Sequence, residues 1–224
     1  DFVNVEVSSI NNFVSIFNAD DITTNSWISI VQRLQQKVDQ ENEKTSKHKL
    51  KKKQGIDFQS QNDKFDGIFR YLKTNGNIIN EVSITSSSNN GYDHYNMLDL
   101  DNIYSIFQTN DTPDSWICFE FKNHQIIPQS YIIRTIHSEN NYHLKSWVVE
   151  GSNDNNNWTK IDEHKNDSSL KGKSRVHLFN ITNNSNEQLF KYIRILQTGP
   201  NWYYNNDRSN VLLIGSIEFY GRLI

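Results

Sequence analysis

Residues 115–121 of the chain read SWICFEF. Ile117, Phe119 and Phe121 stand two residues apart, so an extended backbone places all three side chains on one face and Cys118 on the other. A helix would spread the same three side chains around its circumference. The segment therefore predicts a β-strand that buries one face in a hydrophobic core.

The same period of two continues through the chain beyond Asp66. Nine strands are expected, at Gly67–Leu72, Val82–Thr85, Ser115–Phe121, Gln129–Ile136, Lys145–Glu150, Trp158–Asp162, Arg175–Phe179, Phe190–Gln197 and Leu212–Tyr220. Turn-rich connectors such as GSNDN at residues 151–155 separate them. Many short strands with no helical stretch between them predict a mainly β protein, an antiparallel β-sandwich.

The first 40 residues have a helical pattern instead. Two amphipathic stretches carry apolar residues three and four apart, Ile10, Phe13, Val14 and Phe17 in the first and Trp27, Val31, Leu34 and Val38 in the second. Lysine-rich residues 41–62 follow and have few apolar residues, which indicates a solvated linker. The expected organisation is a short helical segment at 1–40, a charged linker at 41–62 and the sandwich at 63–224.

Composition and charge exclude several classes of protein. The chain has 224 residues with 23 Lys and Arg against 26 Asp and Glu, a formal net charge of -3 that does not suit nucleic-acid binding. The lysine run of the linker lacks interleaved aromatic residues, so an exposed connector is favoured, although a nuclear signal stays open. The one cysteine, Cys118, excludes an internal disulfide and a cysteine-based zinc cluster. No apolar run reaches the length of a membrane span or a signal peptide, so we expect an intracellular, cytoplasmic protein.

Five segments carry a resemblance to a known family. They read GIF at 67–69, SITSS at 83–87, SWVVEGSND at 146–154 with Trp158 and Ile161 after it, KYIRI at 191–195 followed by QTG at 197–199, and IEFYG at 217–221. In this order and spacing, residues 64–224 resemble the coagulation factor 5/8 type C, or discoidin, domain. The resemblance implies a jelly-roll sandwich of the galactose-binding-like superfamily. It also implies a domain without catalytic activity, which binds glycans, lipid head groups or proteins through loops at one end.

The N-terminal segment resembles the tail of a BACK-type helical region, from residues 2–5 through Trp27 and Leu34. Such helices commonly lie between a BTB domain and the sandwich. A ligase-adaptor partner is implied only if a BTB domain lies upstream of Asp1, a question that the sequence leaves open.

Residue patterns for catalysis are missing from the sequence. Cys118 has no Cys–His signature, and the seven histidines form no metal-binding motif. Asp99 and Asp101 could supply oxygens to a structural calcium, but they lack an EF-hand-like pattern. We therefore expect no enzyme activity and no cofactor, with calcium as the weak exception.

Recognition has stronger support, because three long loops combine aromatic and polar residues. They span Ser86–Leu98, His137–His143 and Gly199–Arg208. The candidate ligand-binding residues are Trp202, Tyr203, Tyr204, His94, Tyr95, Arg134 and His143. Aromatic rings suit sugar faces and dominate protein hot spots. The alternative role for Trp202 is that of a lid that covers the end of the core and does not contact a ligand. Arg194 is expected to be structural, stacked or ion-paired on the face of its sheet.

These patterns predict a recognition module for a protein or carbohydrate ligand, with a protein favoured inside a reducing cell. The alternative is peripheral binding to phospholipid head groups, which needs apolar side chains ringed by cations. Arg208 is the only cation near Trp202 in the sequence, and Asp207 stands beside it. Membrane binding is therefore the less favoured function.

Overall fold

The computed structural model describes residues 32–40, 55–61, 64–139, 142–184, 187–203 and 207–224. The chain divides into two compact units, 1–53 and 54–224. In the first unit, residues 32–40 form an exposed helix that carries Leu34 and Val38, which confirms part of the second predicted helix. The first predicted helix lies outside the described residues. No helix among those described is long and apolar enough to cross a membrane.

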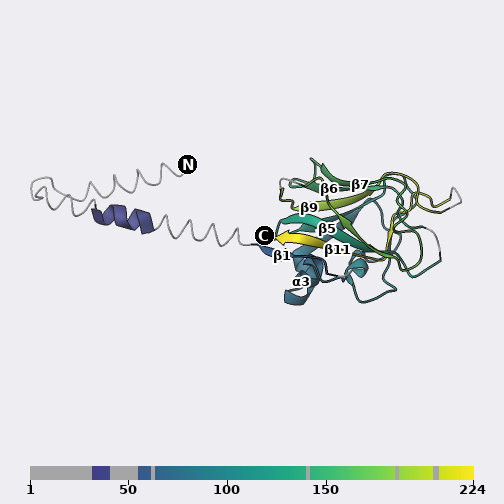
Figure 1. Ribbon diagram of the computed structural model, residues 1–224, viewed down its shortest axis with the longest axis horizontal. Helices are drawn as coiled ribbons and strands as arrows, with labels where there is room; N and C mark the ends of the chain where they lie inside the picture. The colour runs from purple at the N-terminus through teal and green to yellow at the C-terminus, as the bar shows by residue number, and fades with distance from the viewer. Residues whose placement is uncertain (1–31, 41–54, 62–63, 140–141, 185–186, 204–206) are drawn as a thin grey trace, which may run out of the picture. The chain divides into compact units, whose positions relative to one another are not determined.

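The second unit is an antiparallel β-sandwich, as the sequence predicts (Figure 1). One sheet has the order β1-β11-β5-β8, with strands Ile56–Phe58, Ser216–Leu223, Ile126–Arg134 and Val176–Asn180. The other has the order β2-β4-β9-β6-β7, with strands Val82–Ser86, Trp116–Phe121, Tyr192–Gln197, Trp147–Ser152 and Thr159–His164. A two-stranded sheet pairs β3 (Phe107–Gln108) with β10 (Leu213–Ile214). Three short helices, α3 (Ile68–Asn75), α4 (Ile78–Glu81) and η1 (His94–Leu98), complete the unit.

The core lies between the two large sheets and is rich in aromatic rings. Ile117, Phe119 and Phe121 of β4 are fully buried, as their alternation predicts. Phe119 contacts Phe219 of the opposite sheet at a ring-centroid distance of 5.8 Å, and Phe69 of α3 contacts both rings. Each buried side chain of this size stabilises the fold by about 1.5–3 kcal/mol.

Three expectations need correction. Gly67–Leu72 is not a strand, because its apolar residues also fit a helical stripe and the structure buries Ile68, Phe69 and Leu72 as helix α3. Part of the expected linker is strand β1, which pairs with β11 along the sheet edge. The predicted last strand is two strands, β10 and β11, separated by Gly215. A Cβ at Gly215 would come within 2.9 Å of the Arg134 and Thr135 carbonyl oxygens, so the break needs glycine.

Helix α3 has no capping side chain of its own. Its first N–H groups, at Phe69 and Arg70, donate instead to the carboxylate of Glu218 on β11, at 2.7 and 2.9 Å. The Glu218 carboxylate also accepts the N–H of Phe219 at 2.8 Å. A carboxylate at a helix N-terminus is favoured by the helix dipole and by the unpaired N–H groups. Glu218 therefore fixes the start of α3 against β11.

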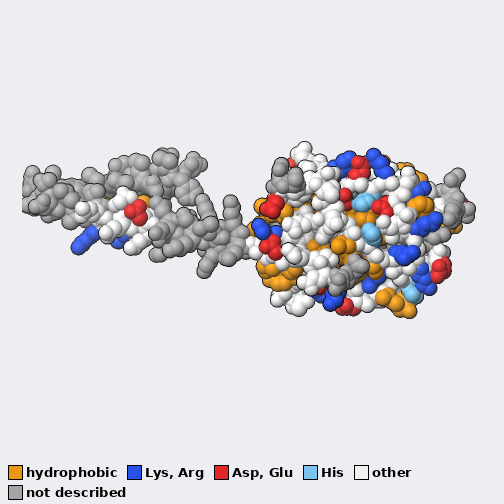
Figure 2. All heavy atoms as spheres, viewed as in Figure 1, with side chains coloured by type: hydrophobic (Ala, Val, Ile, Leu, Met, Phe, Trp, Pro, Cys, Tyr) orange, Lys and Arg blue, Asp and Glu red, His pale blue; other side chains and the backbone are white. Residues whose placement is uncertain are grey.

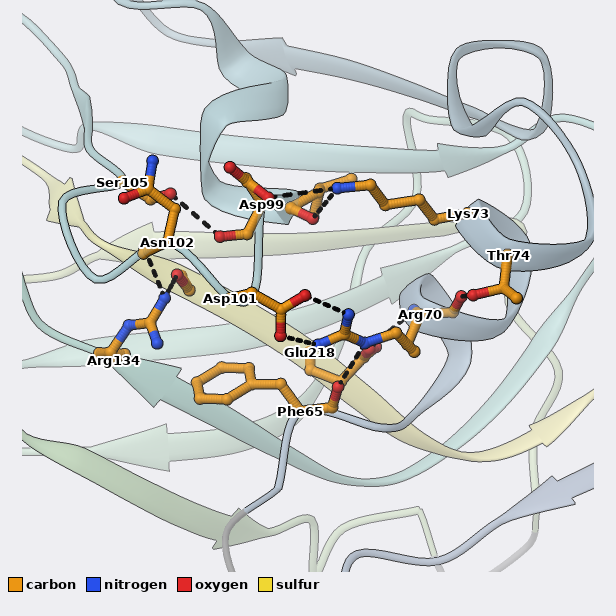
Figure 3. A network of polar contacts seen from close by, with 12 residues as sticks. Phe65, Arg70, Lys73, Thr74, Asp99, Asp101, Asn102, Ser105, Arg134 and Glu218 are labelled. Carbon is orange, nitrogen blue, oxygen red and sulfur yellow. Dashed lines mark hydrogen bonds and ion pairs between the residues drawn. The ribbon is translucent and has the colours of Figure 1, made fainter.

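A network of ion pairs continues from this contact (Figure 3). The Arg70 guanidinium donates to both carboxylate oxygens of Asp101, at 2.6 and 2.7 Å, and to the Phe65 carbonyl. Lys73 lies 3.4 Å from Asp99. The network joins α3 to the loop that follows η1.

The buried carboxyl of Glu218 predicts an unusual pH dependence of stability. Burial raises its pKa from 4.5 to about 7, although the three backbone N–H donors oppose the shift. Between these values the folded chain keeps a proton that the unfolded chain has lost, so the free energy of unfolding falls as pH rises through this window. Glu218→Gln should remove this pH dependence. The NH2 group of the new amide would also face a backbone N–H, so one buried donor loses its acceptor and the free energy of unfolding falls by about 1–3 kcal/mol.

Urea unfolding at pH 5, 6 and 7 measures both effects. Glu120→Gln is the matched control, since Glu120 is a partly exposed carboxylate paired with Lys191. An unchanged pH slope in Glu218→Gln would show that Glu218 does not carry the proton.

Candidate functional site

Three long connections leave the same end of the sandwich. In one sheet β6 begins, and β7 and β9 end, at the paired residues Trp147, His164 and Gln197. In the other sheet β5 ends at Arg134, opposite the start of β11. The connections 135–146, 165–175 and 198–215 join these ends, and we call the surface they form the loop-end surface.

Backbone hydrogen bonds tie these connections together. The N–H of Trp202 donates to the His143 carbonyl at 3.1 Å, and the N–H of Asp167 donates to the Lys145 carbonyl at 2.8 Å. The indole N–H of Trp202 donates to the Asp167 carbonyl at 3.2 Å. Trp202 is partly buried, and its two N–H groups are both used within the fold. These contacts fit the lid alternative better than a free aromatic plate.

Two lysines lie against Trp202, which the sequence did not predict. The Nζ atoms of Lys145 and Lys171 lie 4.7 and 4.5 Å from the centroid of a Trp202 ring. Arg208 is the only cation close to Trp202 along the sequence. In the folded chain Lys145 and Lys171 also lie close to it, so the expectation drawn from the sequence is wrong on this point. Cations at this distance are attracted to the indole face.

Aromatic rings also lie beside Trp202. Tyr203 contacts Tyr142 with ring centroids 4.5 Å apart. Tyr142 packs on a small hydrophobic cluster, separate from the main core, whose buried members are Ile136, Val211 and Leu213. Burial and Tyr203 raise the pKa of Tyr142, while Arg208 opposes the shift. The loop-end surface thus has its own apolar support.

Tyr104 is the aromatic residue that the sequence reasoning missed. It is 69% exposed and meets His137 edge-on, with ring centroids 5.0 Å apart. Its neighbour Ile103 is 42% exposed. The sequence did contain a signal for this residue, because Ile103 and Tyr104 form an apolar pair within the polar turn after Asp101.

The other predicted residues divide into separate groups. Tyr204 lies outside the described residues. His94 accepts or donates a hydrogen bond with the Ser86 hydroxyl at 2.8 Å and stacks on Phe107, and burial lowers its pKa against the opposing effect of Asp93. The hydroxyl of Tyr95 donates to the Val82 carbonyl at 2.9 Å. No contact between His94 or Tyr95 and Trp202 occurs among the described residues.

Arg134 is buried and its guanidinium is engaged within the fold, so its role in ligand contact stays a prediction. It is buried at the end of β5. Its guanidinium donates to the Asn102 carbonyl at 2.8 Å and the Ser216 hydroxyl at 2.6 Å, and it lies over the Phe65 ring. Figure 3 shows these partners around it. Arg134 is the last residue of β5, and its place in the strand puts its side chain on a buried face of the sheet.

Arg194 is structural, as expected. Its guanidinium donates twice to one Glu150 carboxylate oxygen, at 2.6 and 2.9 Å, and lies 4.1 Å from the centroid of a Trp158 ring. The ion pair joins the neighbouring strands β9 and β6 of the five-stranded sheet.

A metal site and a nucleophile find little support in the geometry. Both carboxylate oxygens of Asp101 are bound by Arg70, and Asp99 faces Lys73. No group of three or more potential metal ligands occurs in the part of the chain that the structure describes. Burial raises the pKa of the Cys118 thiol to about 12, so it is protonated at neutral pH.

His143 lies directly beneath the loop-end surface. The residue is 1% exposed, and neither ring nitrogen has a hydrogen-bond partner among the residues that the structure describes. Burial lowers its pKa to about 4, so the ring is neutral at neutral pH. In this arrangement His143 supports Trp202 and is not itself accessible to a ligand.

A buried polar chain connects these loops to the core. The Trp147 indole donates to the Tyr131 hydroxyl at 2.9 Å, and that hydroxyl donates to Asp162 at 2.8 Å. His164 bridges Asp162 and Asp167, at 2.9 and 2.8 Å. Burial lowers the pKa of His164, but the two carboxylates outweigh it and the net shift is upward.

The comparisons with known proteins identify the family. The F5/8 type C domain matches residues 83–212, more than half of the chain. The chain belongs to the F5/8 type C domain family. The match does not reach the N-terminal segment, so its likeness to a BACK-type region stays a prediction.

Solved structures resemble this F5/8 type C domain at low sequence identity. CBM32-3 from a family 31 glycoside hydrolase of Clostridium perfringens has a TM-score of 0.51 and 14% identity over 63% of this chain and 92% of its own. The family 32 CBM of C. perfringens NanJ, solved with galactose, has a TM-score of 0.48 and 15% identity over 63% and 94%. F5/8 type C domains and these CBM32 modules are non-catalytic binding modules.

One curated relative is a much larger protein. The E3 ubiquitin-protein ligase Ufd4 of Drosophila melanogaster is 26% identical over 147 residues, which are 64% of this chain. The chain spans 5% of the length of that relative.

The unpartnered ring of His143 predicts that an apolar replacement stabilises the fold. A buried polar group without a partner costs about 1–3 kcal/mol, so His143→Phe should raise the free energy of unfolding at pH 7 by about 1 kcal/mol. The wild type should also lose stability as pH falls from 6.5 toward 4, because the unfolded ring binds a proton that the folded ring refuses. His143→Phe should abolish this loss.

Thermal and urea unfolding across pH 4–7 provide the measurement, with the exposed His177→Phe on β8 as control. A destabilised His143→Phe would mean that the ring has a partner in solution.

Proposed function

We propose that the chain is a non-catalytic recognition module that binds a carbohydrate or protein ligand at the loop-end surface. The observation that carries the proposal is the exposed Tyr104, which meets His137 of this surface, together with the Tyr142–Tyr203 pair, which packs on a hydrophobic cluster of its own. Large rings kept partly in water forgo burial, and such rings are typical of binding hot spots. The family assignment supports binding without catalysis.

A carbohydrate ligand has support from chemistry and from the fold. Sugar recognition combines aromatic surface with closely spaced hydrogen-bonding groups. Tyr104, Tyr142 and Tyr203 supply rings and hydroxyls, and Arg208 supplies donors beside Tyr142. The structural likeness to a CBM32 module agrees with this choice, although it bears on the fold alone.

The module has a proposed place in ubiquitin ligation. Its likeness to a segment of Ufd4 supports a role as the recognition part of a ligase. The BACK-like N-terminal pattern supports the related arrangement, in which a BTB-BACK adaptor carries the sandwich. In either arrangement the sandwich binds and the ligase chemistry belongs to another domain.

Substitution of the exposed Tyr104 and the half-buried Tyr203 tests the proposed surface. Tyr104→Ala and Tyr203→Ala should each weaken a ligand found on an immobilised glycan panel about tenfold, because each removes about 1.4 kcal/mol of contact. The melting temperature should stay within about 2 °C of the wild type, since surface substitutions change stability little.

Ile79→Ala is the matched control, because Ile79 is 53% exposed on α4, near the start of β2 and away from the loop end. Equal losses of binding in Ile79→Ala and Tyr104→Ala would place the ligand elsewhere.

The second candidate function is peripheral membrane binding. This function needs cations beside exposed apolar side chains. Lys145 and Lys171 lie against Trp202, where the sequence alone did not place them, and Ile103 and Tyr104 are exposed. Sedimentation with phosphatidylserine vesicles at two salt concentrations separates the candidates. Salt-sensitive binding supports the membrane function, and absence of binding removes it.

A further inference from the structure

Both ring nitrogens of His164 face carboxylates. Nε2 lies 2.9 Å from the Oδ2 atom of Asp162, and Nδ1 lies 2.8 Å from the Oδ2 atom of Asp167. An ionised carboxylate only accepts hydrogen bonds, and a neutral imidazole has a single N–H to donate. An imidazolium has two, so it alone can donate to both carboxylates at once. The two short contacts therefore describe a charged His164 between two ionised partners.

The rings that pack against His164 are uncharged. Trp147 of β6 stacks on the imidazole with ring centroids 4.3 Å apart, and Phe179 of β8 meets it at 4.7 Å. The face of an indole attracts a cation, so the Trp147 contact also favours the charged form. Burial lowers the pKa of His164, while the hydrogen bonds and charges of Asp162 and Asp167 raise it, and the net shift is upward.

The titratable groups one step further away have partners of their own. The Tyr131 hydroxyl of β5 donates to Asp162, and its raised pKa keeps that proton in place. Glu163, the next residue in β7, pairs with Lys160 and Lys165 at 2.7 and 3.0 Å. The two carboxylates in direct contact therefore set the charge of the imidazole.

Asp167 joins the three connections of the loop-end surface. It lies in the connection after β7, its N–H donates to the Lys145 carbonyl at 2.8 Å, and its carbonyl accepts the Trp202 indole N–H at 3.2 Å. Its carboxylate accepts the Ser169 N–H through Oδ1 and meets His164 through Oδ2. The position of this one residue thus determines how the connections meet.

A neutral His164 can keep only one of its two contacts. The side chain of Asp162 is 8% exposed, and a buried carboxylate that loses its charged partner is costly. The side chain of Asp167 is 22% exposed, so water can take the place of the imidazole there. The remaining proton therefore stays on Nε2, toward Asp162. The lone pair on Nδ1 then faces the Asp167 carboxylate and repels it.

We propose that the proton on His164 holds Asp167 in place and thereby positions the loop-end surface, so that the surface changes shape when the imidazole is deprotonated. His164 is then a positioning residue, which acts on the surface through Asp167 and Trp202. This pH-dependent device goes beyond the proposed recognition function, because it requires no ligand. The His164 side chain is 19% exposed, so solvent protons reach it, and Figure 2 shows histidine side chains near acidic ones on the surface of the sandwich.

NMR of the ¹⁵N-labelled chain between pH 5.5 and 9 tests the charge directly, because long-range ¹H–¹⁵N spectra report the protonation and the tautomer of each imidazole. We expect His164 to be an imidazolium at pH 6, to titrate with a midpoint above 6.5, and then to carry its proton on Nε2. The indole N–H signal of Trp202 should move with the same midpoint. The indole signal of Trp158, which lies under Arg194 on β9, should not follow it.

Asp167→Asn separates the charge from the packing. The new amide keeps an oxygen for the Ser169 N–H and turns its NH2 group toward Nδ1, so a neutral His164 makes both contacts. We expect the His164 midpoint to fall by at least about one pH unit, because an opposite charge in contact is lost. The Trp202 signal should then stay constant between pH 7 and 9.

Two further variants complete the test. His164→Gln should leave the Trp202 signal without a titration. His177→Gln is the matched control, because it makes the same substitution in a histidine whose ring lies 4.6 Å from that of Phe179, and it should leave the titrations of His164 and Trp202 unchanged.

Three results would overturn the inference. They are a neutral His164 at pH 6, a proton on Nδ1 above the midpoint, and a Trp202 titration that is absent from the wild type or persists in Asp167→Asn or His164→Gln. These readouts involve no ligand, so they leave the recognition function to be decided separately by the tyrosine variants.

Discussion

The hydroxyl of Tyr131 holds the two layers of the sandwich in register. Tyr131 belongs to β5 of one sheet, while Trp147 and Asp162 belong to β6 and β7 of the other. The hydroxyl accepts from one and donates to the other in a fully buried site. Burial and the Asp162 carboxylate raise its pKa well above 10, so it keeps the proton that it donates. A buried polar chain is costly when it is incomplete, so neither sheet can slide over the other without breaking it.

The same chain positions the loop-end surface. From Asp162 it passes through His164 to Asp167, whose carbonyl accepts the indole N–H of Trp202. His164 also stacks on Trp147 at a ring-centroid distance of 4.3 Å, so it is fixed by packing as well as by hydrogen bonds. Trp202 is thus held from the core, and it holds Lys145 and Lys171 in turn.

The sequence predicted what depends on local period and missed what depends on distant contacts. The alternation in SWICFEF identified β4 correctly, because the apolar residues that bury one face of a strand alternate within the sequence of that strand. Residues 68–72 fit a strand and a helix equally well until Glu218, about 150 residues later, supplies the cap that selects the helix. Trp202 was found as an aromatic loop residue, but its lysines come from two other connections. The partners of Arg134 were not foreseen for the same reason, because Asn102 and Ser216 are distant in sequence.

Stability and recognition use different parts of this sandwich. The network of Glu218, Arg70 and Arg134 fixes α3 and the loop after η1 to the four-stranded sheet. The lysines and tyrosines of the loop-end surface contribute little to that network, because their neighbours are other loop residues and a separate small cluster. Substitutions at the rim can therefore change charge and shape without loss of the fold. Such a division allows the loop end to vary while the sandwich itself is kept.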